Sequence, residues 1–437
     1  MSTARSGRIL AERPAARGPL DLLVVSQYFW PEDFRINELV AGLGSRGHRV
    51  TVLTSVPNYP EGTTLPAYAA NRRAFGRFKG CEVIRVPQVT RGRSRLRLVL
   101  NYLSFALAAS LIGPWRLRGR RFDAVFVFQT SPVTVGIPGA LLARLKRARM
   151  IMWILDCWPE TLKAIGVGAG PLAQASVGQL VRAIYASCDL LLGQSEGFRA
   201  NVARYGRESK FRHFPNWVEA VYDSAPAGPS PLVPAAPPGT FTVCYAGNIG
   251  EAQDFPAVLD ALERLEDLPV RLLLVGDGRD LARTRADAQA RGLDHRVLFL
   301  GRHPPAAMPA ILAAADALLV SLKAEPLFAM TVPGKVQTYL AAGRPILAML
   351  DGEGAEVVRR SGAGIAVPAG NAQGLADAVR TLLSLGPEAR ATMGAAGKAF
   401  AQAHYDFTRQ LDRLEEWLGG TYQRAGDAAD RQETPTP

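Results

Sequence analysis

The chain has 437 residues, and its 51 Lys and Arg against 39 Asp and Glu give a formal net charge of +12. A chain of this length exceeds what one hydrophobic core usually supports, so we expect two domains of roughly 200 residues each. Apolar residues make up 48% and charged residues 21%, which excludes an intrinsically disordered protein. The positive charge favours anionic partners such as phosphates, nucleic acid or an acidic bilayer.

Short apolar runs alternate with helical patterns through the N-terminal half. After the first run, Ile36, Leu39, Val40 and Leu43 recur at helical spacing, and a second apolar run follows. Strands that are apolar throughout and separated by helices are typical of a parallel sheet covered on both faces. The expected strands are Leu22–Ser26, Arg46–Thr54, Ala124–Gln129, Met150–Leu155 and Asp189–Gln194.

A segment rich in proline, alanine and glycine, from Ala225 to Gly239, precedes a second series of strands. Such a segment cannot pair in a central strand, so it predicts a linker between domains. Two successive parallel α/β halves form a cleft, in which ligands bind at the carboxyl ends of the strands. The strands expected in the second half are Phe241–Gly247, Val270–Gly276, Arg296–Gly301, Ala317–Leu322 and Arg344–Leu350.

These patterns divide the chain into five parts. We expect a disordered tail at 1–20, a Rossmann-like domain at 21–224, a linker at 225–240, a second Rossmann-like domain at 241–400 and a terminal helix at 401–425. In that helix Phe407, Leu411, Leu414 and Trp417 recur at helical spacing. The helix either packs on its own domain or returns to the first one. The polar end from about Gly426 is expected to be disordered.

An apolar segment with basic flanks runs from Leu96 to Trp115 and is interrupted by Asn101. It is marginal as a membrane-spanning helix, and two alternatives remain: a helix lying in the lipid interface or a core helix covering the first sheet. No basic run interleaved with aromatic residues resembles a platform for nucleic-acid bases, so we expect lipid head groups rather than nucleic acid. The flanking arginines are Arg91, Arg93, Arg95, Arg97, Arg116, Arg118, Arg120 and Arg121.

Four scattered cysteines form no CxxC pair and have no accompanying histidine spacing, so no zinc site is expected. We interpret them as free thiols in a reducing compartment. The first twenty residues hold no apolar run of the kind found in signal peptides, and we expect neither a leader nor an anchor there. The cysteines are Cys81, Cys157, Cys188 and Cys244.

A resemblance extends from about Leu22 to Leu418. The chain resembles glycosyltransferase family 4 in the order and spacing of several segments, and some of them resemble the branch of N-acetyl-L-fucosamine transferases of surface polysaccharide assembly. The resemblance implies a GT-B fold, with two Rossmann-like domains facing an interdomain cleft. The segments that carry it are YFWPEDFRINELVAGLGSRGHRVTVLT, PNYPEG, DCWPET, FPNWVE, YAGNIG, LLVGDG, VLFLGR and TVPGKVQTYLAAGRPI.

The C-terminal half offers three ways to hold the diphosphate of a sugar nucleotide. A diphosphate is bound by cations, by backbone N–H groups or by a helix N-terminus. Lys323 ends an expected strand, and Gly334 and Lys335 open an expected helix. We therefore assign Lys323 and Lys335, with the backbone of Gly334, to the diphosphate, although both lysines could instead be solvated surface residues.

Other donor-binding candidates lie at the ends of expected strands. Gly247, Asn248 and Gly250 follow one strand, where small residues would let a diphosphate approach the backbone. Gly276 follows another and is expected to permit close packing near the nucleotide. The resemblance implies that the turn at Arg302 brackets the uracil base, though a simple turn explains it nearly as well.

The chain departs from the family in three places, one of which is the loop after the first strand, where the usual double glycine is absent. The family has a Glu-x7-Glu pattern whose second glutamate binds the ribose, but this chain has Thr338 there and Met330 at the first. Thr338, Gln337 or the nearby Glu325 would then take over ribose binding. Many relatives also place a histidine after the strand that ends at Gln129, and here Thr130 and Ser131 follow. That absence is compatible with a retaining mechanism in which the leaving phosphate takes the proton of the acceptor.

Candidate acceptor residues lie in the N-terminal half. Asp156 and Glu160 follow a buried strand, where their carboxylates could orient sugar hydroxyls, act as a base or cap the next helix. The resemblance further implies that Glu32, Asp33 and Arg35, in the loop after the first strand, approach the acceptor and the donor phosphate.

The leading hypothesis is a hexosyltransferase that moves N-acetyl-L-fucosamine or another hexosamine from a UDP-sugar to a polyprenyl-diphosphate-linked saccharide. We expect it to be cytoplasmic and peripheral to the inner face of the cell membrane, on an anionic surface. Neither a cofactor nor a metal is expected. The alternatives are a GT-B sugar-nucleotide epimerase or phosphorylase, and a non-catalytic protein that binds sugar nucleotides.

Overall fold

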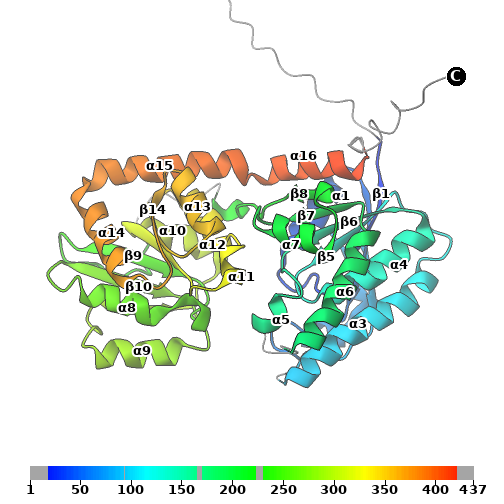
Figure 1. Ribbon diagram of the computed structural model, residues 1–437, viewed down its shortest axis with the longest axis horizontal. Helices are drawn as coiled ribbons and strands as arrows, with labels where there is room; N and C mark the ends of the chain where they lie inside the picture. The colour runs from blue at the N-terminus through cyan, green and yellow to red at the C-terminus, as the bar shows by residue number, and fades with distance from the viewer. Residues whose placement is uncertain (1–17, 93, 165–169, 223–229, 421–437) are drawn as a thin grey trace, which may run out of the picture. The chain divides into compact units, whose positions relative to one another are not determined.

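Two sheets organise the computed structural model, which describes residues 18–92, 94–164, 170–222 and 230–420 (Figure 1). The first has eight strands in the order β3-β4-β2-β1-β5-β6-β7-β8, and the second has six in the order β11-β10-β9-β12-β13-β14. Each sheet is built from one continuous half of the chain. The predicted α/β architecture with two Rossmann-like parts is confirmed.

The eight-stranded sheet is mostly parallel. β1 pairs with β2, β2 with β4, β6 with β7 and β7 with β8 in parallel, whereas the short β3 lies antiparallel to β4. All five expected strands are present. The strands are β1 (Asp21–Ser26), β2 (Arg49–Ser55), β3 (Arg77–Phe78), β4 (Cys81–Val86), β5 (Ala124–Gln129), β6 (Arg149–Ile154), β7 (Leu190–Gly193) and β8 (Phe211–His213).

The six-stranded sheet is parallel throughout its five pairings. All five strands expected in this half are present, whereas β14 at its edge, whose four residues are all half-buried, was not expected. The strands are β9 (Phe241–Ala246), β10 (Val270–Val275), β11 (Val297–Gly301), β12 (Ala317–Ser321), β13 (Ile346–Met349) and β14 (Gly364–Val367).

Helices connect the strands and cover the sheets. Those of the first half are α1 (Arg35–Ser45), α2 (Pro66–Ala70), α3 (Arg95–Arg116), α4 (Gly136–Lys146), α5 (Thr161–Ala164), α6 (Pro171–Ser187) and α7 (Phe198–Tyr205). Those of the second half are α8 (Phe255–Glu263), α9 (Leu281–Ala290), α10 (Met308–Ala313), α11 (Pro326–Ala329), α12 (Gly334–Ala342), α13 (Glu353–Arg360), α14 (Ala372–Ser384), α15 (Gly386–His404) and α16 (Phe407–Leu418).

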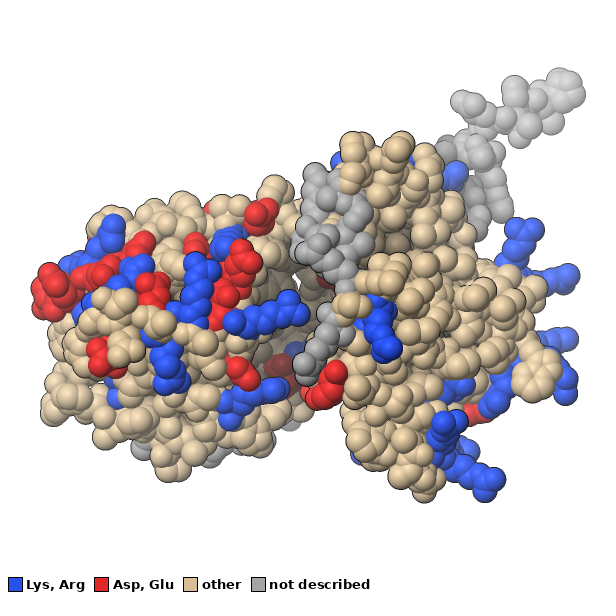
Figure 2. Space-filling view, turned by 90° about the horizontal axis from the view of Figure 1, so that it is seen from below, with Lys and Arg blue, Asp and Glu red and all other residues tan. Residues whose placement is uncertain are grey.

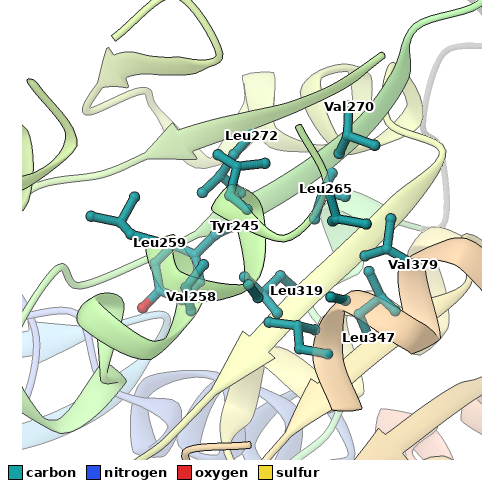
Figure 3. Close-up of a cluster of buried hydrophobic side chains, with 14 of the residues drawn as sticks. Tyr245, Val258, Leu259, Leu265, Val270, Leu272, Leu319, Leu347 and Val379 are labelled. Carbon is teal, nitrogen blue, oxygen red and sulfur yellow. The ribbon is translucent and has the colours of Figure 1, made fainter. Parts of the chain in front are cut away.

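The second sheet separates two hydrophobic cores. Successive residues of a strand point to opposite faces, so Leu272 and Leu274 of β10 enter one core while Leu273 and Val275 enter the other. The first core also receives side chains of α8 and α14 (Figure 3). Each fully buried leucine contributes about 1.5–3 kcal/mol, so the sheet forms a rigid base for the loops at its edge.

The last helix has contacts with elements of the N-terminal half. One compact unit combines residues up to Val127 with Ile137–Met150 and the chain from Leu414 onward, and the other comprises Phe128–Gly136 and Ile151–Arg413. Within the first unit, Glu415 of α16 accepts from Arg46 Nη1 at 2.5 Å and lies 2.8 Å from His48 Nε2. Arg149 Nη1 donates to the carbonyl oxygen of Trp417 at 2.9 Å.

Some predictions fall on residues that lie outside the described ranges. These are the tail up to residue 17, Arg93, residues 225–229 of the expected linker, residues 421–425 of the expected terminal helix, and the polar end that follows it. The four cysteines are described; all are free, as predicted, and the structure shows that all are buried. Burial raises the pKa of Cys157 and of Cys188, which makes both thiols poor nucleophiles.

Candidate functional site

The loops after β9 and β10 meet through glycines at the edge of the second sheet. Gly247 and Gly276 follow these strands with φ of +138° and +136°, values that favour glycine. A Cβ atom on Gly276 would lie 1.9 Å from the carbonyl oxygen of Gly247, and one on Gly278 would lie 2.0 Å from that of Ile249. The two loops can approach each other this closely only because Gly276 and Gly278 have no side chains.

Lys335 reaches across this glycine edge from the first turn of α12. Its Nζ lies 3.8 Å from the centroid of the Tyr245 ring and donates to the Tyr245 hydroxyl. A Cβ atom on Gly247 would lie 2.6 Å from Lys335 Cε, so the missing side chain leaves room for the lysine. Burial lowers the pKa of Lys335 to about 7, because the ammonium group loses hydration. An anion placed beside it would restore the charge.

Tyr245 links the lysine to the core of the second sheet. Its ring packs edge-on against Phe255, with centroids 4.9 Å apart at 79°, and its hydroxyl donates to the carbonyl oxygen of Asn248 at 2.5 Å. Figure 3 shows the hydroxyl pointing away from Leu265, Val270 and Leu272. The packing of the Tyr245 ring in the apolar core therefore fixes the position of the hydroxyl oxygen to which Lys335 donates.

The loop after β9 is also joined to the loop after β12. The Oε1 atom of Gln253 accepts from Asn248 Nδ2 at 3.2 Å and from the backbone N–H of Gly250 at 3.0 Å. The Lys323 side chain donates to Glu251 Oε1 at 3.0 Å, and this bond lowers the pKa of Glu251. The structure therefore brings Gly247, Asn248, Gly250, Gly276, Lys323 and Lys335 to one edge of the second sheet.

The start of α12 holds the residues expected to bind ribose. Gly334 is exposed, and a Cβ atom there would meet open space. Gln337 is buried, and in the amide orientation that satisfies its surroundings the nitrogen donates to the carbonyl oxygens of Pro333 at 3.0 Å and Gly334 at 3.1 Å. Its amide therefore stabilises the turn at the start of α12. This leaves Thr338 as the better placed of the two neighbours.

Glu219 lies beside Thr338 and was not among the expected site residues. The Thr338 hydroxyl donates to Glu219 Oε2 at 3.0 Å. The carbonyl oxygen of Gly334, at 3.2 Å, is a second and more distant acceptor for the same hydroxyl. A carboxylate from 119 residues earlier thus stands next to the position where the family pattern has its second glutamate. Glu219 ends the segment FPNWVE, which was noticed in the sequence only as a family segment.

Two further donor candidates lie on exposed positions. Arg302 follows β11, whose Gly301 accepts a backbone hydrogen bond from Gly276 at 2.8 Å. Glu325 is the residue before α11, and its side chain is exposed. Both remain predictions.

A carboxylate and a hydroxyl meet at the ends of β5 and β6. Ser131 Oγ donates to Asp156 Oδ2 at 2.6 Å, and Gln129 Nε2 donates to the Asp156 carbonyl oxygen at 3.3 Å. Burial raises the pKa of Asp156, and the bond from Ser131 opposes this shift. A carboxylate of this kind accepts hydrogen bonds more strongly than an ordinary aspartate. Sequence analysis identified Asp156, whereas its partner Ser131 was noticed only because it is not a histidine.

Glu160 has partners within the same half of the chain. Its Oε2 accepts from Asn201 Nδ2 at 2.8 Å, and its Oε1 lies 3.8 Å from Arg204 Nη1. Asn201 also donates to the Trp158 carbonyl oxygen at 3.2 Å. These contacts hold Glu160 against α7.

Glu32 has a structural role that sequence analysis did not foresee. Its carboxylate is buried and accepts from the backbone N–H groups of Phe29 at 3.2 Å, Asn58 at 2.7 Å and Tyr59 at 2.7 Å. Burial raises its pKa, and these three bonds oppose the shift. Glu32 therefore ties the loop after β1 to the loop after β2.

The neighbours of Glu32 are more accessible. Asp33 is exposed, and Arg35 lies 3.7 Å from Glu38 in the first turns of α1. Of the three acceptor candidates in this loop, Asp33 and Arg35 are the ones that a ligand can reach.

Comparison with known proteins finds two matching family descriptions. "Glycosyl transferases group 1" matches residues 240–385, and "Glycosyl transferase 4-like domain" matches residues 34–217. The chain is 30% identical to WcaI of Escherichia coli (strain K12), named as a colanic acid biosynthesis glycosyl transferase, over 318 residues, or 70% of this chain and 76% of WcaI. It is 27% identical to the glycosyltransferase WbjE of Pseudomonas aeruginosa over 246 residues, or 55% of this chain and 60% of WbjE.

Solved structures resemble the chain over nearly its whole length. Anabaena Alr3699/HepE in complex with UDP and glucose has a TM-score of 0.65 at 15% identity, over 92% of this chain and 99% of that one. WaaG, a glycosyltransferase involved in lipopolysaccharide biosynthesis, has a TM-score of 0.61 at 15% identity, over 92% and 100%. At identities this low the similarity is evidence for the fold alone, and the predicted GT-B fold is confirmed.

Proposed function

Because the chain belongs to the group 1 glycosyl transferases, we propose that it transfers a hexosamine from a UDP-sugar to a lipid-linked saccharide. WcaI is named for colanic acid biosynthesis and WaaG for lipopolysaccharide biosynthesis, and HepE was solved with UDP. These names support a role in making a surface polysaccharide. N-acetyl-L-fucosamine is the donor sugar that we propose, on the strength of the resemblance to its transferases.

The observation that carries this proposal is the half-buried lysine at the glycine edge. Lys335 lies over the backbone of Gly247 and has a lowered pKa. Lys323 bonds to Glu251 in the loop that also contains Gly247. A diphosphate bound there would meet two cations and the N–H groups at the start of α12. Nothing in this arrangement requires a metal, because the lysines supply the charge.

The reaction that we propose retains the configuration of the sugar. The bond between the anomeric carbon and the diphosphate oxygen breaks, and UDP leaves with the electron pair. The hydroxyl oxygen of the acceptor forms the new bond to the anomeric carbon, and its proton passes to the leaving phosphate. Lys323 and Lys335 stabilise the charge that develops on the diphosphate, and Asp156 orients the acceptor hydroxyl by accepting its hydrogen bond.

A donor screen tests the proposal. Purified protein is incubated with a panel of UDP-sugars and a synthetic polyprenyl-diphosphate-linked saccharide, and the products are weighed by mass spectrometry. We expect one donor to add one hexosamine mass to the acceptor and to release UDP. Conversion of a donor into an isomeric UDP-sugar in the absence of acceptor would indicate an epimerase, and binding of UDP without turnover of any donor would indicate a non-catalytic protein; either result contradicts the proposal.

We also propose that α3 attaches the enzyme to the inner face of the cell membrane. Its segment Leu96–Arg116 is long and apolar enough to span a bilayer by length and composition, with a mean hydropathy of 1.6. Asn101, Phe105 and Ala109 are fully buried, which places one side of the helix against the protein. The opposite side exposes leucines, so a helix lying in the interface fits better than a spanning one.

The exposed side of α3 forms a continuous apolar stripe. Figure 2 shows a largely tan face on the right-hand body, with blue Lys and Arg side chains along its margin. Basic margins around an apolar stripe favour anionic lipid, by about 1 kcal/mol for each nearby cation. The residues of the stripe are Leu96 (69% exposed), Leu100 (43%), Leu103 (53%), Leu107 (63%), Leu111 (68%) and Trp115 (60%).

Replacing Leu107 by Glu should weaken binding to anionic vesicles about tenfold, because the lost burial of one leucine costs about 1.5 kcal/mol or more. Co-sedimentation with phosphatidylglycerol-containing vesicles measures this change. Leu145→Glu is the matched control, since Leu145 is 55% exposed but belongs to α4. Equal loss in both variants, or none in Leu107→Glu, would refute the assignment.

A further inference from the structure

A polar pocket between α6 and α7 includes the candidate residue Glu160, but its other lining residues were not among the expected site residues. It has a volume of about 450 Å³ and is open to solvent. Along α6 the lining residues recur at intervals of three and four, so one face of that helix forms a wall. The polar lining residues are Glu160, Gln174, Gln179, Arg182, Arg204 and Tyr205.

Two arginines converge on one aromatic ring in this pocket. The guanidinium carbons of Arg182 and Arg204 each lie 5.4 Å from the centroid of the Tyr205 ring. A Cβ atom on Gly178 would lie 3.2 Å from the same ring, so the glycine lets α6 approach it closely. The tyrosine thereby holds two positive charges at the edge of one pocket.

The charge of this arginine pair is only partly balanced. Arg204 has Glu160 at 3.8 Å, and Glu160 already accepts a shorter bond of 2.8 Å from Asn201. Arg182 is exposed, and within the described ranges it forms no ion pair. A neighbouring anion would therefore gain charge-assisted hydrogen bonds, and planar guanidinium groups match the geometry of phosphate.

The remaining lining suits hydroxyl groups. The amides of Gln174 and Gln179 can each donate and accept, as the hydroxyls of a sugar require, and the volume exceeds that of a lone phosphate several times. At the start of α6, beside the lining residue Pro171, Leu172 is 85% exposed. An apolar group at the rim would accommodate the chain of a lipid-linked ligand.

We propose that this pocket binds a phosphate-bearing saccharide, with Arg182 and Arg204 on the phosphate and the glutamine amides on the sugar hydroxyls. Such a group occurs in a lipid-linked diphosphate saccharide and in a soluble sugar phosphate. If the ligand is the acceptor, the assignment rests on the proposed function and adds the place where the acceptor phosphate is held. The pocket itself does not depend on the donor site.

Calorimetric titration with the full chain tests the proposal, using glucose 1-phosphate, glucose, and citronellyl-diphosphate-linked N-acetylglucosamine as probes. Saturating UDP is present throughout, so that the probes cannot report binding at the lysines of the second half. We expect glucose 1-phosphate to bind at least tenfold more tightly than glucose. Tighter binding of the citronellyl compound would identify the lipid-linked source, and equal binding would identify soluble sugar phosphates.

Arg182→Ala and Arg204→Ala should each weaken binding of the phosphorylated probes about tenfold and leave UDP affinity unchanged. Alanine favours helix at position 182, so the variant retains α6. Arg144→Ala is the matched control, because it removes the same charge from an exposed position of α4 outside the pocket. The proposal fails if glucose 1-phosphate binds no better than glucose, or if both pocket variants bind it as the control does. Neither failure would affect the donor screen, which measures transfer.

Discussion

Replacement of Asp156 by Asn should lower the rate of sugar transfer about 100-fold or more while leaving UDP affinity unchanged. The neutral amide can still accept from Ser131, so the loop keeps its local bond, but it orients an acceptor hydroxyl less strongly than a carboxylate. Initial rates with the donor and acceptor identified by the screen measure the effect. A parallel titration with UDP checks that the donor site is intact.

The pH dependence of the same variant separates an orienting role from a merely structural one. Burial raises the pKa of Asp156, so the carboxylate protonates at a higher pH than an ordinary aspartate. The wild-type rate should therefore fall as the pH drops through this raised pKa, because the protonated acid no longer serves as an anionic acceptor. In Asp156→Asn this acidic decline should disappear. A variant that retains the wild-type profile would exclude Asp156 from the reaction.

Replacement of Lys335 by Met should weaken UDP binding about 30-fold, equivalent to about 2 kcal/mol for one charge-assisted hydrogen bond. Methionine has a similar length, so it fills the space over Tyr245 and Gly247 without a charge. Calorimetric titration with UDP measures the loss. Donor hydrolysis should fall in the same variant, because the leaving diphosphate loses a stabilising cation.

UDP affinity of the wild-type protein should also fall as the pH rises above 7. Burial lowers the pKa of Lys335 to about 7, so the lysine is charged below that pH and neutral above it. Binding a diphosphate above pH 7 then requires uptake of a proton, and affinity falls by up to about tenfold per pH unit. Lys335→Met should abolish this slope, whereas Lys323→Ala should weaken binding and retain it. A wild-type affinity that is constant from pH 7 to 9 would contradict the assignment.

Most of the strands that sequence analysis recognised are buried on both faces, and β11, in which only Val297 is fully buried, is the exception. Leu22 to Val25 in β1 are fully buried, and such uninterrupted apolar runs cannot be confused with surface segments. β4 was not recognised, because Glu82 and Arg85 interrupt its apolar residues. β3 and β8 have too few residues for any periodicity to be measured, and the four residues of β14 are only half-buried.

The candidate site was recognised only in part. Sequence analysis identified several of its residues but not the groups to which their side chains bond. Lys335 was identified from its place before a helix, but its contact with Tyr245 joins residues 90 positions apart. Gln337 was expected to face a ligand, yet its amide bonds to the turn that precedes its helix. Glu32 was expected at the acceptor, yet three backbone N–H groups occupy its carboxylate. Each outcome depends on where a side chain points.

Local pattern was therefore sufficient for most of the strands, the two-sheet architecture and the family, since hydrophobic periodicity and motif spacing are properties of neighbouring residues. Tertiary structure alone decided which polar groups meet. In the second sheet β9 lies between β10 and β12, so its loop meets loops that are distant in sequence. Because strand order brings such segments together, Lys335 reaches Tyr245 and Glu219 reaches Thr338 in ways that no local pattern encodes.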